Sequence, residues 1–251
     1  MPDDISSILR GWPFEPGRIN VRLVEGADGR KKMQIRVQLG LLQLELEGRP
    51  DGERPHGFES LLEYQLDRVR RYQKDSPGAS GFVLTIDECR ALREEAVMFY
   101  HRYVGLFVLE EYEGVVRDTS RNLAVIDLLR DYAADELDRQ TLEQFRPHVI
   151  MMRARAEAAR AISQKNPRAA LKLLEAAIVE IRAALSEAGS SGDSDESNEL
   201  QLLEGMRDAL VPRLPVSQRV ELEERLQAAI AAENFELAAI LRDELRMLRE
   251  S

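Results

Sequence analysis

Three histidines and one cysteine are the side chains of this 251-residue sequence that titrate nearest to neutral pH. His56, His101 and His148 are widely separated, and none has an acidic neighbour three or four residues away in a ligand-like spacing that other residues support. A metal-dependent nuclease site is therefore not predicted. Cys89 has no histidine within local reach, which favours a buried structural thiol over a nucleophile. We expect His101, which stands in an aromatic-rich stretch, to pack at the edge of a core.

A phosphate-binding loop is not found in the sequence. No GxxxxGKS or GxxxxGKT string occurs, and the nearest counterpart, residues 26 to 32, lies between two stretches that alternate apolar and polar residues. A phosphate loop must be followed by a helix whose N-terminus faces the anion, so this stretch is predicted to be a hairpin turn. Helicase activity driven by nucleotide hydrolysis is therefore not expected, and no cofactor is predicted.

Two charged helix faces are the remaining candidates for chemistry. An acidic ridge is predicted on one helix from three aspartates spaced by four, Asp127, Asp131 and Asp135. A basic patch with two interleaved tyrosines is predicted on another helix: Arg68, Arg70, Arg71 and Lys74, with Tyr64 and Tyr72. We interpret both as solvent-facing sides of amphipathic helices, because arginines stand near the ridge and the patch holds few cations. Nucleic-acid contact through the patch is the less favoured alternative.

The composition limits the class of protein. Hydrophobic residues make up 44% of the chain, enough for a core, and the formal net charge of -10 argues against a broad surface for nucleic acid or anionic membranes. A single cysteine excludes an internal disulfide and a zinc site built on several thiolates. The N-terminal stretch lacks the basic and apolar regions of a signal peptide, and no long uncharged apolar run occurs, so we expect a cytoplasmic protein.

The N-terminal region, residues 1 to 57, is predicted to be a small antiparallel sheet. Apolar and polar residues alternate from 19 to 23 and from 33 to 39, and Asp28-Gly29 between these runs is typical of a hairpin turn. After Gly40 the apolar positions shift by one, which either a bulge or a tight turn into a third strand would produce.

Residues 58 to 187 are predicted to be helical, which makes the fold class α+β. Helices are expected over residues 58 to 74, 86 to 109, 112 to 137, 141 to 163 and 166 to 187, and Thr85 with Glu88 forms a capping box before the second. We favour a plain helical bundle; the alternative is a pair of degenerate tetratricopeptide-like segments at 103 to 123 and 161 to 185. Residues 188 to 198 indicate an acidic flexible linker, and residues 199 to 251 a further helical segment.

Residues 215 to 250 are predicted to form an antiparallel helical hairpin with more apolar surface than one neighbouring helix can cover. Leu222 and Leu226 belong to the stripe of the first helix, and Leu237, Ile240 and Met247 widen the stripe of the second to roughly half its circumference. Such a short segment lacks a self-sufficient core, so it must dock on the rest of the chain, on a second copy or on a partner. Phe235, at the predicted turn, either packs on its own hairpin or inserts into the surface on which the hairpin docks.

The same segment resembles the UVR motif shared by the excision-repair proteins UvrB and UvrC. The resemblance rests on residues 220 to 226, Ala229, Asn234-Phe235-Glu236 at the turn, Ala238-Ala239, and the run from Leu241 to Leu245. It implies a non-catalytic hairpin that associates with another hairpin of its kind. By that resemblance the apolar contacts are Leu226, Phe235, Leu241 and Leu245, framed by Arg242 and Asp243.

The sequence therefore predicts a non-enzymatic adaptor that docks through its hairpin, in the first place as an accessory factor of UvrB/UvrC-type nucleotide excision repair. UVR motifs also occur in a Clp-type ATPase and in an activator of a protein-arginine kinase, so an adaptor in stress-linked proteolysis is a second hypothesis. An enzyme within the helical region and a self-associating structural protein are the others. Residues 213 to 251 carry six arginines and eight acidic side chains, so direct nucleic-acid binding is not expected.

Overall fold

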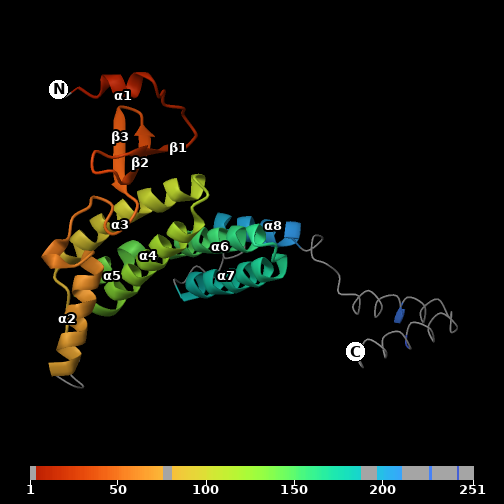
Figure 1. The fold of residues 1–251 in the computed structure, drawn as a ribbon. Coiled ribbons are helices and arrows are strands. Elements are labelled where there is room, and N and C mark those ends of the chain that lie inside the picture. Colours follow the sequence, from red (N-terminus) through yellow and green to blue (C-terminus); the bar gives the residue numbers. More distant parts are fainter. Residues whose placement is uncertain (1–3, 76–80, 188–196, 211–225, 228–241, 243–251) are drawn as a thin grey trace. The chain divides into compact units, whose positions relative to one another are not determined.

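The computed structural model describes residues 4–75, 81–187, 197–210, 226–227 and 242 (Figure 1). The chain divides into two compact units, Met1–Asp208 and Ala209–Ser251, so the sheet and the long helices belong to the same unit. An antiparallel sheet near the N-terminus is followed by a mainly helical region, which confirms the α+β class. Within the described part, none of the helices is both long enough and apolar enough to cross a membrane.

The sheet has strand order β1-β2-β3, and β1 (Asn20–Glu25), β2 (Lys31–Val37) and β3 (Gly40–Glu45) are each antiparallel to their neighbour. The predicted hairpin turn at Asp28-Gly29 is confirmed: Gly29 has a φ of 73°, and the Gly26 amide donates to the Arg30 carbonyl over 2.8 Å. The shift of the apolar positions after Gly40 results from a second tight turn that leads into a third strand, since Val37 pairs with Gly40.

Two residues of the sheet differ from the simple alternation. Leu39 is predicted within a strand, but it lies in the β2–β3 turn and is 90% exposed. Gln34 is predicted on a polar face but is buried, because its side chain is held on both sides: Arg22 Nη2 donates to Gln34 Oε1 over 2.8 Å, and Gln34 Nε2 donates to Gln43 Oε1 over 3.0 Å. A polar ladder across the three strands thus satisfies a buried amide.

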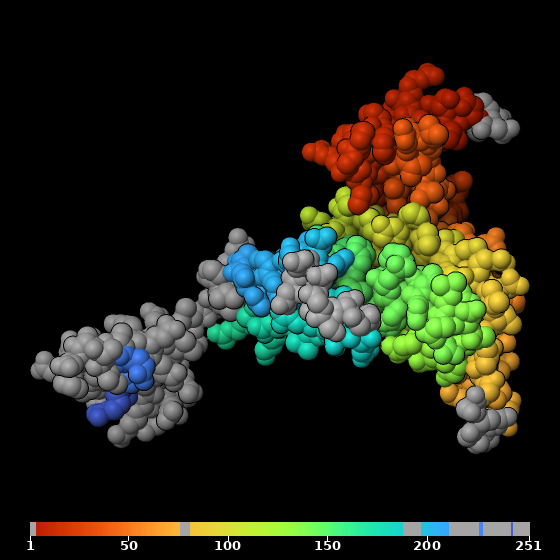
Figure 2. All heavy atoms as spheres, turned by 180° about the vertical axis from the view of Figure 1, so that it is seen from behind, coloured from red at the N-terminus to blue at the C-terminus, as the bar shows by residue number. Residues whose placement is uncertain are grey.

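The other face of the sheet packs on helix α3 (Ile86–Val108), and Figure 1 shows the strands beside this helix. In the space-filling view, the red and orange atoms of the N-terminal region lie against yellow ones (Figure 2). Met33 is fully buried there, and Ile35 and Leu44 are nearly so. Gly105 allows the close approach, since a Cβ at that position would lie 2.6 Å from Met33 Sδ and 3.3 Å from Ile35 Cδ1. Apolar packing against a helical glycine therefore fixes the sheet to the helices.

The described helices besides α3 are a short α1 (Ser6–Arg10), α2 (Leu61–Asp75), α4 (Tyr112–Tyr132), α5 (Glu136–Glu143), α6 (Arg146–Ser163), α7 (Pro167–Glu187) and α8 (Asn198–Leu210), with a 3-10 turn at Pro55–Gly57. The predicted capping box opens α3: the Glu88 amide donates to Thr85 Oγ1 over 3.3 Å, and the Thr85 amide donates to Glu88 Oε2 over 2.9 Å. Helices α3, α4, α6 and α7 pack against one another in that order.

The prediction of one helix over residues 112 to 137 is wrong, because α4 ends at Tyr132 and α5 begins at Glu136. Asp135 is the N-cap of α5, and its carboxylate accepts a hydrogen bond from the Leu137 amide over 2.8 Å. Asp135 therefore does not share a helix with Asp127 and Asp131, and the predicted acidic ridge loses its third member.

A tertiary contact accounts for this break. The Leu84 amide, from the segment before α3, donates to the Tyr132 carbonyl over 2.8 Å, and Ala133 adopts an extended conformation beside Leu84. The stretch predicted as one helix over residues 141 to 163 is also divided, since α6 begins at Arg146 with a proline in its first turn.

The α3–α4 and α6–α7 connections have the same backbone geometry. Glu110 in the first has a φ of 60°, and Lys165 in the second has a φ of 58°. In both connections the amide of the following residue donates over 2.9 Å to the carbonyl five residues earlier, as in a Schellman turn. The two connections, which fall within the two segments of the tetratricopeptide-like alternative, thus use the same turn, a common one at helix ends.

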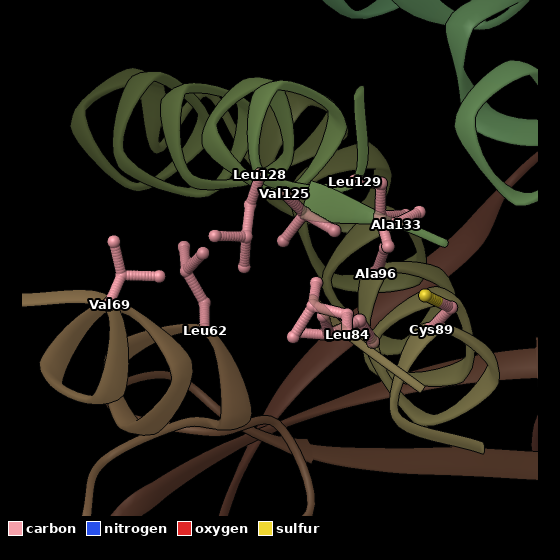
Figure 3. Packing of buried hydrophobic residues seen from close by; sticks show 10 residues of the cluster. Leu62, Val69, Leu84, Cys89, Ala96, Val125, Leu128, Leu129 and Ala133 are labelled. Atoms are coloured by element: carbon pink, nitrogen blue, oxygen red, sulfur yellow. The ribbon is translucent and has the colours of Figure 1, made fainter. Parts of the chain in front are cut away.

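One hydrophobic core lies where α2, α3 and α4 meet (Figure 3). Its buried members are Leu62, Val69, Leu84, Cys89, Leu92, Ala96, Val125, Leu128, Leu129 and Ala133. Burial raises the pKa of the Cys89 thiol to about 11, so the group stays protonated and unreactive at neutral pH. The prediction of a buried thiol is confirmed.

Helix α8 adds to the helical body. Its Leu200 and Leu203 are buried, and Arg182 of α7 donates to Glu204 of α8 over 2.7 Å. Glu199 of α8 lies 4.0 Å from the Nδ1 atom of His148 on α6. The helix thus contacts both α6 and α7 at the end of the first unit.

Candidate functional site

The predicted partner-binding residues fall almost wholly outside the described part of the chain. Leu226 is described, and it is helical and half-buried. The other contact residues lie outside the described residues: Leu222, Phe235, Leu237, Ile240, Leu241, Leu245 and Met247. Of the two residues expected to frame them, Arg242 is helical and exposed, and Asp243 lies outside the described residues. The contact role of this set therefore stays a prediction.

A buried ion pair joins the sheet to the helices. The side chains of Arg102 on α3 and Asp118 on α4 are each 1% exposed, and the guanidinium donates two hydrogen bonds to the carboxylate, over 2.7 and 2.8 Å. Arg102 also donates to the carbonyls of Glu45 and Gly48, over 3.0 and 2.8 Å, at the end of β3. Because the guanidinium is committed to these partners, we assign it to positioning the sheet and not to binding a ligand.

A second buried carboxylate holds the start of α2. Glu95 of α3 is fully buried, and its Oε1 accepts a hydrogen bond from the Leu61 amide over 2.8 Å. It also pairs with Arg49 and Arg121, and the Arg121 guanidinium lies 3.6 Å from the centre of the Phe99 ring. A carboxylate at a helix N-terminus satisfies amides that lack intrahelical partners, and it interacts favourably with the helix dipole. Glu95 therefore has a structural role, although it is a buried acid.

The predicted basic patch on α2 is partly neutralised. Arg68 pairs with Glu88 of α3 and donates to Gln65 over 2.7 Å, and Arg71 pairs with Asp67 over 2.7 Å. Cations held in such pairs are less available to phosphates, so the structure supports a solvated helix face.

Metal chemistry finds no support in the described residues. Among them, no group of three or more histidine, cysteine, aspartate or glutamate side chains could hold a metal ion. His56 stacks on the ring of Tyr64 with ring centres 4.0 Å apart. An enzyme in the helical region is expected to show a deep polar pocket with clustered titratable groups. A pocket between α3, α4, α5 and α6 is lined instead mainly by apolar and aromatic side chains.

This apolar pocket, between α3, α4, α5 and α6, is the feature that the sequence interpretation missed. Its volume is about 470 Å³, and no Asp, Glu, Lys or Arg lines it. The lining residues are Ala96, Val97, Tyr100, His101, Tyr103, Asn122, Ile126, Leu142, Phe145, His148 and Val149. The aromatic-rich stretch around His101 was a partial signal, but nothing in the sequence places His148 opposite it.

Burial sets the charge of the pocket. It lowers the pKa of His101 and of His148, so both imidazoles are neutral at pH 7. For His148, Arg155 on α6 acts in the same direction, while Glu199 on α8 opposes the shift. Burial also raises the pKa of the Tyr103 phenol. The pocket is therefore uncharged at neutral pH.

The neutral histidines make the stability of the protein dependent on pH. Because the pKa of His148 is lowered from 6.5 by folding, the unfolded chain takes up the proton first, and stability is lost as the pH falls below 6.5. Wild-type protein is therefore expected to lose more unfolding free energy than His148→Gln between about pH 7.5 and about pH 5.5. Urea unfolding of both proteins across this range measures the difference. The carboxylates are common to both, so equal losses would contradict the burial of a neutral imidazole.

Comparison with known proteins gives one match. No curated protein and no solved structure is significantly similar to the chain. The model of one family, described as the UvrB/uvrC motif, matches residues 218–251, within the second compact unit. The segment recognised from its residue string is thus confirmed, and the C-terminal unit of this protein carries a UVR motif.

Proposed function

We propose that the protein is a non-enzymatic adaptor whose UVR motif docks on a second UVR-type hairpin, most directly that of UvrB or UvrC in nucleotide excision repair. The observation that carries this proposal is the family match at residues 218–251. UVR motifs act in protein–protein contact, and the matched family is described by its excision-repair members. The motif also lies in a compact unit separate from the sheet and the long helices, as suits a docking module.

The chemistry of the segment supports a protein partner over direct DNA binding. Residues 213 to 251 carry six arginines and eight acidic side chains, which gives the segment no net positive charge for phosphates. The apolar stripes predicted from its sequence exceed what one antiparallel helix can cover, which favours a further apolar surface as their neighbour. The adaptor would therefore meet DNA through its partner.

The proposal is tested by titrating the full-length chain with purified UvrB, UvrC and a Clp-type ATPase from the same organism. We expect binding to UvrB or UvrC, and we expect Phe235→Asp to weaken it by about 30-fold or more, the loss typical of an interface hot spot. Binding to the Clp-type ATPase alone would instead support the role of an adaptor in protein quality control. Light scattering of the wild type and of Phe235→Asp measures self-association, which is the remaining use of the hairpin.

A matched control is available in the first unit. Phe145, after α5, is 51% exposed, so Phe145→Asp places the same change on a different apolar surface. This variant is expected to bind the partner as the wild type does. Loss of binding in Phe145→Asp with normal binding in Phe235→Asp would contradict docking through the UVR motif.

A further inference from the structure

The apolar pocket between α3, α4, α5 and α6 has the construction of a small-molecule site. Its floor is buried, with Ile126 and Val149 nearly inaccessible, while large apolar side chains at the rim stay about half exposed: Val97, Tyr100 and Phe145. The volume of about 470 Å³ lies within the range of roughly 300 to 1,000 Å³ common for ligand pockets. An exposed apolar rim around a buried floor is costly to leave open to water, which favours an occupant.

Rings dominate the wall of this pocket. The Tyr100 ring contacts several of them: its centre lies 5.4 Å from that of Tyr103, in an edge-to-face arrangement, and 6.4 Å from that of His148. His101 lies 5.4 Å from the same Tyr100 ring, and Phe145 adds a further ring at the rim. Such walls favour an occupant with a flat ring, because aromatic rings attract one another in offset and edge-to-face geometries.

Polar groups in the pocket have unused hydrogen-bonding capacity. Tyr103 is 1% exposed, no hydrogen bond joins its hydroxyl to a residue in the described part of the chain, and the hydroxyl oxygen is not completely closed off. The ring nitrogens of His101 likewise have no hydrogen-bond partner there, although the ring is half-buried. By contrast, Asn122 on the same wall is satisfied, since its Nδ2 donates to the Ala96 carbonyl over 3.0 Å. Tyr103 lines the pocket and its hydroxyl has no protein acceptor among the described residues, so an occupant that supplies an acceptor gains affinity from its hydrogen bond.

The charge of the pocket narrows the class of occupant. No Asp, Glu, Lys or Arg lines it, so a charged molecule would lose its hydration without finding a counter-ion. We propose that this pocket binds an uncharged small molecule that contains an aromatic ring and a carbonyl-type acceptor, with the Tyr103 hydroxyl as donor to that acceptor. The proposal concerns the first compact unit and does not depend on the role of the UVR motif.

Benzophenone is a suitable probe, because it has two rings and one carbonyl and forms covalent adducts under near-ultraviolet light. Titration of the full-length protein, followed by ligand-observed NMR, is expected to show saturable binding. Irradiation is expected to label peptides from α3 and α6. Diphenylmethane, which has the rings without the carbonyl, should bind more weakly, and the anion 4-benzoylbenzoate should bind more weakly still.

Three variants distinguish the contribution of the Tyr103 hydrogen bond to binding from that of the pocket as a whole. Tyr103→Phe should weaken benzophenone binding about fivefold, the value of one ordinary hydrogen bond, and leave diphenylmethane unaffected. The control Tyr64→Phe, on α2 and outside the pocket, should change neither affinity. Val97→Trp at the half-exposed rim should block both probes without disturbing the fold, which thermal unfolding checks.

Several results would overturn the proposal. Labelling scattered over the surface, or labelling unaffected by Val97→Trp, would show that the pocket is not a ligand site. Equal affinity for benzophenone and diphenylmethane, or equal weakening of both by Tyr103→Phe, would show that Tyr103 does not donate a hydrogen bond to the ligand carbonyl. Loss of protein-partner binding in Phe145→Asp would identify the pocket as a docking surface for a protein instead.

Discussion

Replacing Asp118 by alanine is expected to lower the free energy of unfolding by about 3–5 kcal/mol, the cost typical of leaving one member of a buried ion pair without its partner. Asp118 and Arg102 are both 1% exposed, and two short hydrogen bonds join them. Without the carboxylate, the Arg102 charge stays buried next to the carbonyls of Glu45 and Gly48. Urea unfolding of the full-length protein measures the loss.

A surface pair provides the control for this prediction. Asp87 and Arg90 form an ion pair over 2.8 Å in which both side chains are well exposed, so Asp87→Ala should cost less than about 1 kcal/mol. The double variant Arg102→Met with Asp118→Leu should recover part of the loss, because it removes the buried charge as well as its partner. Similar losses in Asp118→Ala and Asp87→Ala would contradict the structural role of the buried pair.

Leu129→Ala is expected to lower the free energy of unfolding by about 2–5 kcal/mol, because it removes methyl groups from the core and leaves a cavity. Leu129 is fully buried where α4 faces α3 (Figure 3). Leu137→Ala is the matched control, since Leu137 is 73% exposed, and it should change stability by about 0.5 kcal/mol or less. Equal effects of the two substitutions would show that the α2–α3–α4 core is not packed as described.

Elements that depend on neighbouring residues could be predicted from the sequence. The hairpin turn at Asp28-Gly29 and the capping box of Thr85 and Glu88 are local patterns, and the structure confirms both. The end of α4 could not be predicted, because it depends on a hydrogen bond between Leu84 and Tyr132, which stand far apart in the chain. Local periodicity contains no information about such a contact, so the helix predicted from it runs beyond Tyr132.

The candidate sites show the same division. The UVR motif is a contiguous string, so its residues could be recognised directly, and the family match confirms it. The pocket is assembled from four helical segments, and its two histidines, His101 and His148, stand far apart in sequence. In the sequence, Arg102 and Asp118 cannot be distinguished from ordinary surface charges. Only the structure shows that both side chains are buried. Sites that depend on packing require the structure.

Affinity capture from a lysate of the source organism tests whether the UVR motif is the docking element. Full-length wild-type protein and Phe235→Asp serve as parallel baits, and mass spectrometry identifies what each retains. We expect the wild type to retain a UVR-bearing partner, UvrB or UvrC in the first place, and Phe235→Asp to lose it. Retention of the same partners by both baits would show that the UVR motif is not the docking element.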